Sequence, residues 1–228
     1  TVFDHHPTAS HLRYPWIYGP GQLVPREWKV VRRILDGRKR IVLPDGGASL
    51  QAAAFGQNAA AAVMAVIDAG HKSSGEIYNV CDEWTPTLLQ WVEIIAAALD
   101  HNFEIVNIPW EYATVARRLT LRGTPHHRVT SSEKAIFDLG YRDVVDPIEG
   151  LSATARYLAA NPLDRGGSAE RSLGDRFDYE AARPELERLT SDSSLGRDAR
   201  WHLANIALTK LRDDPARARL LFLREMRL

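Results

Sequence analysis

The chain has 228 residues, which is enough for one domain with a substantial core, or for one domain with an appendage. Lys and Arg together number 29, as do Asp and Glu, so the formal net charge is zero. This balance argues against nucleic acid or an anionic membrane as the main partner, because both attract proteins with a basic surplus. A hydrophobic content of 45% and a charged content of 25% are typical of a soluble globular protein.

Cys81 is the only cysteine, so no disulfide can form within the chain, which suits a reducing cytoplasm. It lies in a strand-like run, which favours a buried small hydrophobe over a nucleophile. No apolar run reaches the roughly 18 residues needed to cross a bilayer. The N-terminal residues do not have the form of a signal peptide. We therefore expect a cytoplasmic protein that has no membrane partner.

The first half of the chain alternates short strands with helices. The predicted elements are a strand at 10–14, a helix at 25–36, a strand at 40–43, a helix at 57–69 and a strand at 76–81. Prolines and glycines between 15 and 23 exclude regular structure there. The helix at 57–69 consists mostly of small and apolar residues, so we expect it to be buried all round, against a sheet.

The second half continues this pattern as far as residue 160. The predicted elements are a helix that starts at 85–87, a strand at 103–108, a helix at 110–119, a loop at 121–127, and helices at 131–139 and 147–160. Strands that alternate with helices of ten or more residues indicate βαβ units and a parallel sheet. Residues 163–174 are rich in Gly, Ser, Asp and Arg, and residues 163–178 are predicted to be a linker.

Only helical patterns follow, so residues 179–228 are predicted to be an all-helical tail with helices at about 179–189, 197–211 and 215–227. Residues 201–218 weakly resemble one tetratricopeptide-type helical hairpin. A single copy does not make a repeat array, because stacking needs about three. A helical appendage that packs on the body is the favoured alternative.

Two clusters of side chains could suggest a bound phosphate or a metal ion, but the sequence favours neither site. A basic group flanks the end of the helix at 25–36, and a solvated face is favoured over a phosphate-binding patch. Its members are Arg32, Arg33, Arg38, Lys39 and Arg40. The histidines at 5, 6, 11, 126 and 127 have no cysteine or carboxylate at a supporting spacing, so we predict no metal site.

The most informative segment is 12–22, a short strand that ends in a Pro/Gly turn and carries an arginine and two tyrosines. It resembles the Arg…Tyr-Gly-Pro-Gly segment of the extended short-chain dehydrogenases/reductases, the NAD(P)-dependent epimerase/dehydratase family. Further family segments follow in the family's order and with near-family spacing, at 43–47, 55–60, 75–80, 131–141 and 148–158.

In that family the segment lies past the middle of the chain, after the nucleotide-binding glycines and the catalytic Tyr-x-x-x-Lys. Neither motif occurs ahead of residue 12 here. The resemblance therefore implies that residues 1–162 are the C-terminal part of such an enzyme, which would use NAD or NADP for chemistry at a hydroxyl or carbonyl carbon. The implied fold is α/β: the last strands of a Rossmann-type parallel sheet plus a small α/β substrate-binding subdomain. We expect no catalytic residue in this chain and no activity from the chain alone.

The resemblance also suggests roles for single residues. Tyr14 and Pro15 would face the nicotinamide end of the cofactor through their backbone. Arg13 would be structural or would reach toward an acidic ligand group, and Tyr18 would pack in the loop between the cofactor and substrate domains. By family position, His127 or Arg128 would line the substrate pocket.

Two departures bear on the substrate. Trp16 stands where nucleotide-sugar epimerases have an asparagine, and Gln51 stands where they have a phosphate-gripping arginine. Glutamine cannot supply the charged fork that suits phosphate. A nucleotide-sugar substrate is therefore doubtful, and a less charged small molecule, or a site that no longer binds one, is expected.

A second hypothesis is a non-catalytic binding or interaction module that derives from this family and recruits partners through its tail. If the chain is natural as it stands, exposed sheet edges and apolar helix faces should make it self-associate. A homo-oligomer is therefore left open.

Overall fold

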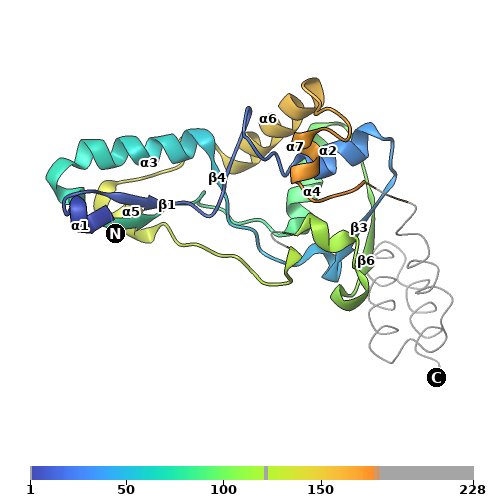
Figure 1. Cartoon of the computed structure of the whole chain (residues 1–228), viewed down its shortest axis with the longest axis horizontal. Coiled ribbons are helices and arrows are strands. Elements are labelled where there is room, and N and C mark those ends of the chain that lie inside the picture. The colour runs from blue at the N-terminus through green and yellow to red at the C-terminus, as the bar shows by residue number, and fades with distance from the viewer. Residues whose placement is uncertain (1, 121–122, 178, 180–228) are drawn as a thin grey trace, which may run out of the picture.

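The computed structural model describes residues 2–120, 123–177 and 179. These residues form a mixed α/β structure with short parallel sheets, arranged in two lobes along the long axis (Figure 1). The predicted α/β class with parallel strand pairing is confirmed. The predicted helical tail lies outside the described residues, apart from Tyr179. Among the described helices, none combines the length and the apolar character needed to cross a membrane.

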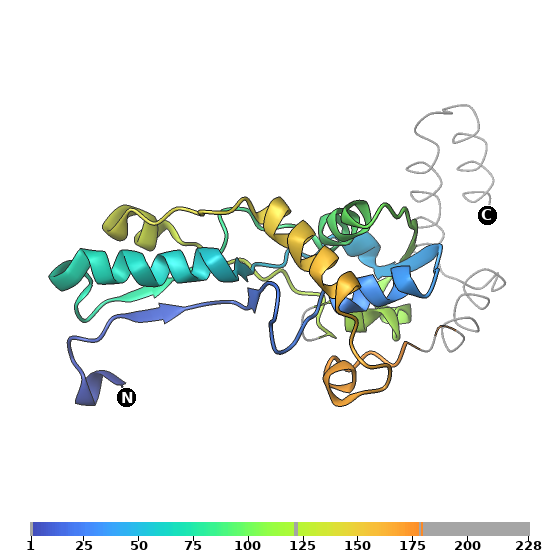
Figure 2. The ribbon, with the colours of Figure 1, turned by 90° about the horizontal axis from the view of Figure 1, so that it is seen from above.

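The first lobe is built on one parallel strand pair, β1 (His11–Arg13) with β5 (Ile77–Asn79). Helices α3 (Gly56–Ala69) and α5 (Glu133–Leu139) pack beside this pair, and α1 (Val2–His5) lies at its far end (Figures 1 and 2). Its small core joins α3, β5 and α5 and consists of Ala62, Tyr78, Val80, Ala135 and Tyr141.

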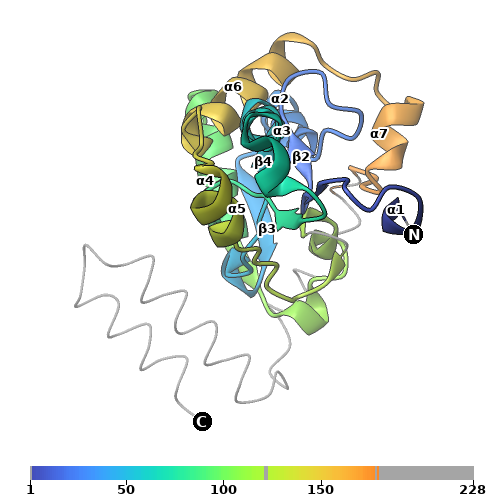
Figure 3. The ribbon, with the colours of Figure 1, turned by 90° about the vertical axis from the view of Figure 1, so that its left-hand side faces the viewer.

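The second lobe is built on another parallel pair, β3 (Arg40–Pro44) with β6 (Glu104–Ile108). Helices α2 (Trp28–Leu35), α4 (Leu88–Ala98) and α6 (Pro147–Ala160) pack against one another beside β3, as the end-on view of Figure 3 shows. Short helix α7 (Ser168–Ser172) completes the lobe. The larger of the two cores lies here and includes Trp28, Val30, Val31, Ile41, Leu43, Leu88, Val92, Ile95 and Leu151.

A third parallel pair joins the lobes: β2 (Ile17–Tyr18) with β4 (Ala54–Phe55). Each lobe contains residues from early, middle and late parts of the described chain. The chain therefore passes between the lobes several times at this junction. The prediction that 15–23 holds no regular structure was wrong for β2. Tyr18 and Phe55 are buried with ring centroids 5.4 Å apart, and this packing stabilises a strand that the flanking prolines alone would not predict.

Several element ends follow the predicted signals. Helix α6 has the predicted bounds, and the Asp146 carboxylate accepts hydrogen bonds from the backbone N–H groups of Ile148 and Glu149. Gly140 ends α5 in the left-handed conformation at φ 67°. Helix α4 begins later than predicted, because Thr87 rather than Thr85 caps it through a capping box with Gln90.

Two predicted helices differ from the structure. Residues 110–119 form two 3-10 turns, Trp110–Tyr112 and Ala116–Leu119, rather than one α-helix. The Arg117 guanidinium binds the carbonyl oxygens of Trp110 and Glu111, which stabilises this folded-back path. Helix α3 is not buried all round. One face of the helix packs in the first lobe. Val63, Met64 and Ile67, elsewhere on the helix, are 43%, 54% and 62% exposed.

The predicted linker is packed as far as it is described. Glu170 on α7 is buried, accepts a hydrogen bond from the Trp28 indole at 2.9 Å, and pairs with Arg32 at 2.5 Å. Asp175 pairs with Arg33 at 2.8 Å. Residues 163–177 therefore cover α2, and two members of the basic cluster are neutralised inside the fold rather than solvated. The domain boundaries 1–162, 163–178 and 179–228 stay a prediction.

Candidate functional site

The junction between the lobes is organised by a buried carboxylate, Asp82, which is 4% exposed. It accepts hydrogen bonds from the Tyr18 hydroxyl at 2.9 Å, the Phe55 backbone N–H at 2.9 Å and the Asn58 side-chain amide at 3.0 Å. Burial raises the pKa of the Asp82 carboxyl, and burial next to Asp82 raises the pKa of the Tyr18 phenol. Tyr18 thus stays a neutral donor, which suits a structural role.

Asn58 extends this network to the segment before α6. Its side-chain oxygen accepts from the backbone N–H groups of Val144 and Val145, and its amide donates to the Val145 carbonyl, each at 2.9 Å. The Tyr18 hydroxyl also lies 3.2 Å from the Pro147 carbonyl oxygen. The network therefore holds together β2, β4, the end of β5 and the start of α6.

A small cavity adjoins Asp82. Its walls are aromatic and include Trp16, Trp84 and Trp91, together with Gln51. Trp16 and Trp91 meet edge to face with ring centroids 6.3 Å apart. The volume is about 10 Å³, which is room for about one water molecule. The two predicted substrate residues Trp16 and Gln51 therefore share one cavity.

The other predicted substrate residues lie next to Gln51. Gln51 and Arg128 form an isolated parallel bridge, and the Ala52 N–H donates to the Arg128 carbonyl oxygen at 2.8 Å. The Leu50 N–H donates to the His127 ring nitrogen Nδ1 at 3.1 Å. The Nε–H of Arg128 and the indole N–H of Trp16 are buried without a hydrogen-bond partner among the described residues. Two unpaired donors thus belong to this group of residues.

The predicted cofactor residues lie at another place, where the chain leaves β1 and enters β2. Arg13 is the last residue of β1, is exposed, and stands opposite Asn79. The Tyr14 hydroxyl donates to the Ala59 carbonyl oxygen at 2.9 Å, which ties this turn to α3. Tyr14 and Pro15 therefore lie between two parallel strand pairs, and neither lines the cavity at Gln51.

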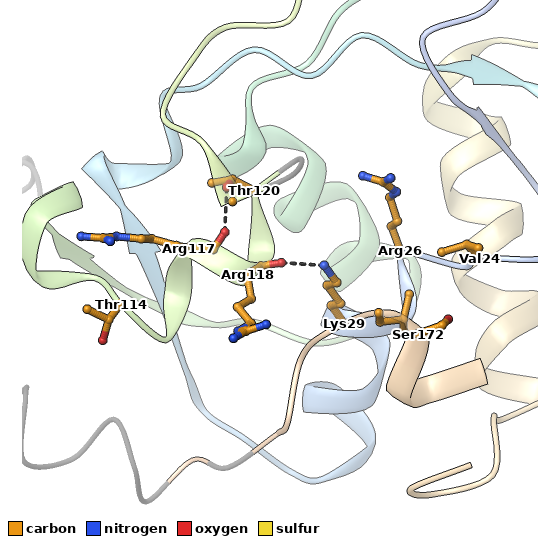
Figure 4. A pocket seen from close by; sticks show the side chains of 10 residues that line it. Val24, Arg26, Lys29, Thr114, Arg117, Arg118, Thr120 and Ser172 are labelled. Carbon is orange, nitrogen blue, oxygen red and sulfur yellow. Dashed lines mark hydrogen bonds between the residues drawn. The ribbon is translucent and has the colours of Figure 1, made fainter. Parts of the chain in front are cut away.

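A larger cavity of about 360 Å³ lies in the second lobe (Figure 4). Four of its lining side chains are cationic: Arg26, which precedes α2, Lys29 in the first turn of α2, and Arg117 and Arg118 from the turn Ala116–Leu119. The Arg26 guanidinium also lies 4.4 Å from the centroid of the Trp16 ring, so this cavity is a neighbour of the first. None of these four residues was predicted from the sequence to line a site.

No family model and no curated protein sequence matches the chain, but solved structures do. UDP-glucuronic acid 4-epimerase from Bacillus cereus, in complex with UDP-glucuronic acid and NAD, shares 16% identity over 66% of this chain and 45% of its own, with a TM-score of 0.52. An epimerase from Methanothermobacter thermautotrophicus shares 18% identity over 68% and 44%, with a TM-score of 0.50. UDP-glucose 4-epimerase from Thermotoga maritima, with UDP-glucose, shares 18% identity over 66% and 45%, with a TM-score of 0.50.

The chain has the fold of part of an NAD-dependent epimerase. It spans about 45% of the length of these structures. The fold that the resemblance of segment 12–22 implies is therefore confirmed. At such identities the likeness concerns the fold, and the roles of single residues stay predictions.

Sequence reasoning missed Asp82, Asn58 and Lys29. Asp82 could have been noticed as the first charged residue after a strand, where parallel strands deliver side chains to a common edge. Asn58 lies in the segment 55–60 that carries part of the family resemblance. Lys29 gave no signal, because a lysine on a short helix is ordinarily a solvated residue.

Proposed function

We propose that this chain forms the substrate-binding half of an NAD(P)-dependent epimerase, dehydratase or reductase that acts on a hydroxyl or carbonyl carbon, and that it works with a nucleotide-binding half. The observation that carries the proposal is the shared fold over about two-thirds of the chain, with TM-scores of 0.50 to 0.52. One of these structures holds NAD and UDP-glucuronic acid, and another holds UDP-glucose.

The position of Tyr14 and Pro15 fits one wall of a cofactor site. In open α/β sheets, ligands bind beyond the carboxyl ends of the strands, where the strand order changes. Tyr14 and Pro15 follow β1 at the point where parallel pairing with β5 gives way to parallel pairing of β2 with β4. Their backbone would contact and orient the cofactor, which supplies hydride transfer when bound. The Tyr14 hydroxyl, bound to Ala59, would hold this wall in place.

The residues around Gln51 fit the substrate side. An N–H that is buried without an acceptor costs about 1–3 kcal/mol, so a bound hydroxyl or carbonyl oxygen would relieve Trp16 and Arg128. The aromatic walls and the neutral Gln51 suit an uncharged part of a substrate. The side chains would have to separate to admit it, because the cavity volume is about 10 Å³.

The surface of the first lobe supports the need for a second half. Within the described residues, β1 pairs on one edge only, with β5. Parallel sheets are ordinarily covered on both faces, and free strand edges invite pairing. The exposed Val63, Met64 and Ile67 of α3 add an apolar surface to the same lobe. A nucleotide-binding half would cover these groups.

Fluorescence titration with NADH and NADPH tests the proposal. The chain alone should bind neither tightly and should show no turnover. The coding sequence upstream should encode a strand, a glycine loop and a helix, followed by Tyr-x-x-x-Lys, and co-expression of that segment should restore binding. Tight binding by the chain alone would contradict the proposal. A natural start codon directly before Thr1 would favour the non-catalytic interaction module.

A further inference from the structure

Two side chains at the entry to α2 are joined by one hydrogen bond and each keep an oxygen atom without a partner. The Gln22 amide nitrogen Nε2 donates to the Glu27 carboxyl oxygen Oε2 at 2.6 Å. The other oxygen of each group, Oε1 of Gln22 and Oε1 of Glu27, is buried and has no hydrogen-bond partner among the described residues. Glu27 is 0% exposed, so bulk water does not reach its carboxyl group. Buried polar atoms are ordinarily paired, so these two oxygens need an explanation.

One proton would satisfy both oxygens. A carboxylic acid and a primary amide can join through two hydrogen bonds, from the amide N–H to the carbonyl oxygen of the acid and from the O–H of the acid to the amide oxygen. The first of these bonds is present between Gln22 and Glu27. A proton on Oε1 of Glu27 would donate to Oε1 of Gln22 and supply the second. Because the two oxygens without partners belong to side chains that are already joined, the pair lacks only this proton.

The surroundings favour the protonated form of Glu27. Burial raises the pKa of its carboxyl to about 7, although its own backbone N–H, the Gln22 amide and the charges of Arg26 and Lys29 act to lower that pKa. The Tyr18 phenol faces Glu27 from β2, and burial, together with the charges of nearby carboxylates, raises its pKa, so it stays neutral. Glu27 is therefore mostly protonated below about pH 7 and mostly ionised above it.

The pair fastens the loop between β2 and α2, residues 19–24. Among the described residues, the bond from Gln22 to Glu27 is the one side-chain hydrogen bond of this loop. The Gln22 backbone N–H makes a longer bond within the loop, at 3.3 Å. Leu23 and Val24, which follow, are 93% and 46% exposed. Val24 also lines the larger cavity, so the position of the loop shapes one wall of that cavity.

We propose that Gln22 and Glu27 form a proton-dependent latch, in which protonated Glu27 binds the Gln22 amide through two hydrogen bonds and ionised Glu27 holds residues 19–24 less firmly. When the proton leaves for the solvent, the carboxylate keeps the bond from Nε2, but neither Oε1 atom has a donor. A buried charge that is incompletely hydrogen-bonded favours loop movements that admit water. The latch needs no NAD(P) and no second half, so it does not rest on the proposed function.

An NMR titration of the full chain between about pH 5 and about pH 8.5 tests the protonation step. The side-chain carboxyl carbon of Glu27 should titrate with a midpoint near 7, and the side-chain N–H resonances of Gln22 should shift with the same midpoint. A Glu27 midpoint at the ordinary 4.5, or Gln22 resonances that do not follow Glu27, would overturn the proposal.

Hydrogen exchange of the Gln22 backbone N–H, measured by NMR, tests the effect on the loop. Glu27→Gln is the reference, because a second amide has an N–H in place of the O–H of the acid and does not ionise. At the same pH, exchange in the unmodified protein should equal that in Glu27→Gln below about pH 6 and be about tenfold faster at about pH 8.5, as expected for the loss of about one hydrogen bond. Equal rates at both pH values would contradict the latch.

Two more variants separate the latch from a general effect of pH. Gln22→Met removes the amide at nearly constant side-chain length and should abolish the step in exchange near pH 7 at position 22. Glu93→Gln, at an exposed position on α4, is the matched control and should keep the step. Circular dichroism should show that both variants are folded. A step that persists in Gln22→Met, or that is lost in Glu93→Gln, would also overturn the proposal.

Discussion

Glu27 is the carboxylate whose burial has the clearest energetic consequence. It is 0% exposed, its Oε2 atom accepts from Gln22, and its Oε1 atom has no hydrogen-bond partner among the described residues. Burial raises its pKa from 4.5 to about 7, against the opposing hydrogen bond from Gln22 and the charges of Arg26 and Lys29. Ionised Glu27 should therefore destabilise the fold, and Glu27→Gln should remove that penalty.

The sign and size of the penalty for ionised Glu27 follow from the linkage between protonation and folding. The folded state holds the Glu27 proton more tightly than the unfolded state, whose pKa is near 4.5. The free energy of unfolding therefore falls as pH rises from 4.5 to about 7, and the penalty is constant above that range. At about 1.4 kcal/mol for each pH unit, the penalty at pH 8 is about 3 kcal/mol. Glutamine does not ionise, so the variant should lack this part of the pH dependence.

Urea unfolding followed by tryptophan fluorescence between pH 4.5 and pH 8 measures the effect. Relative to the unmodified protein, Glu27→Gln should gain about 3 kcal/mol in unfolding free energy between these two pH values. Glu93→Gln, at an exposed position on α4, is the control for the loss of one negative charge and should follow the unmodified protein. If Glu27→Gln also runs parallel to the unmodified protein across this range, the reasoning about burial is refuted.

Substitutions at two further positions test the junction and the packing beneath it. Asp82→Ala should cost about 2–4 kcal/mol in urea unfolding, because it leaves the buried Phe55 N–H without its acceptor, whereas Asp82→Asn keeps an acceptor oxygen and should cost less. Equal losses in the two variants would contradict this. Gly150→Ala would place a Cβ atom 2.8 Å from the Phe55 ring, so thermal unfolding should show a loss of about 1–3 kcal/mol from overpacking, partly offset by about 1 kcal/mol of helix propensity. A stabilised Gly150→Ala variant would show that Phe55 moves aside freely.

The strand and helix order was predictable where local signals are strong. Helix α6 has Asp146 as cap, Pro147 at its first position and Asn161-Pro162 after its end, so its bounds follow from local chemistry. Pairing of β1 with β5, and the shared fold, agree with the resemblance of segment 12–22. Trp16 and Gln51 do line one cavity, next to His127 and Arg128.

The failures concern features that only tertiary contacts determine. Composition cannot show which face of α3 is covered, so Val63, Met64 and Ile67 were expected to be buried. The polar composition of 163–177 suggested a linker, yet Glu170 and Asp175 pair with arginines that are far away in sequence. For the same reason the cationic cavity was missed, since Lys29 and Arg118 meet only in the folded chain.

The repeated passage of the chain between the lobes has a consequence for how the fold can form. Neither lobe is a continuous stretch of sequence. In the first lobe β1 pairs with β5, and in the second the Trp28 indole on α2 donates a hydrogen bond to Glu170, a residue 142 positions later. During synthesis, the buried Arg33 on α2 must therefore wait for Asp175, which follows α7, before its charge is paired. Such distant pairings slow folding, because long loops have to close first. Since Tyr18, Asn58 and Asp82 tie these passages together, the two lobes should melt as one cooperative unit rather than separately.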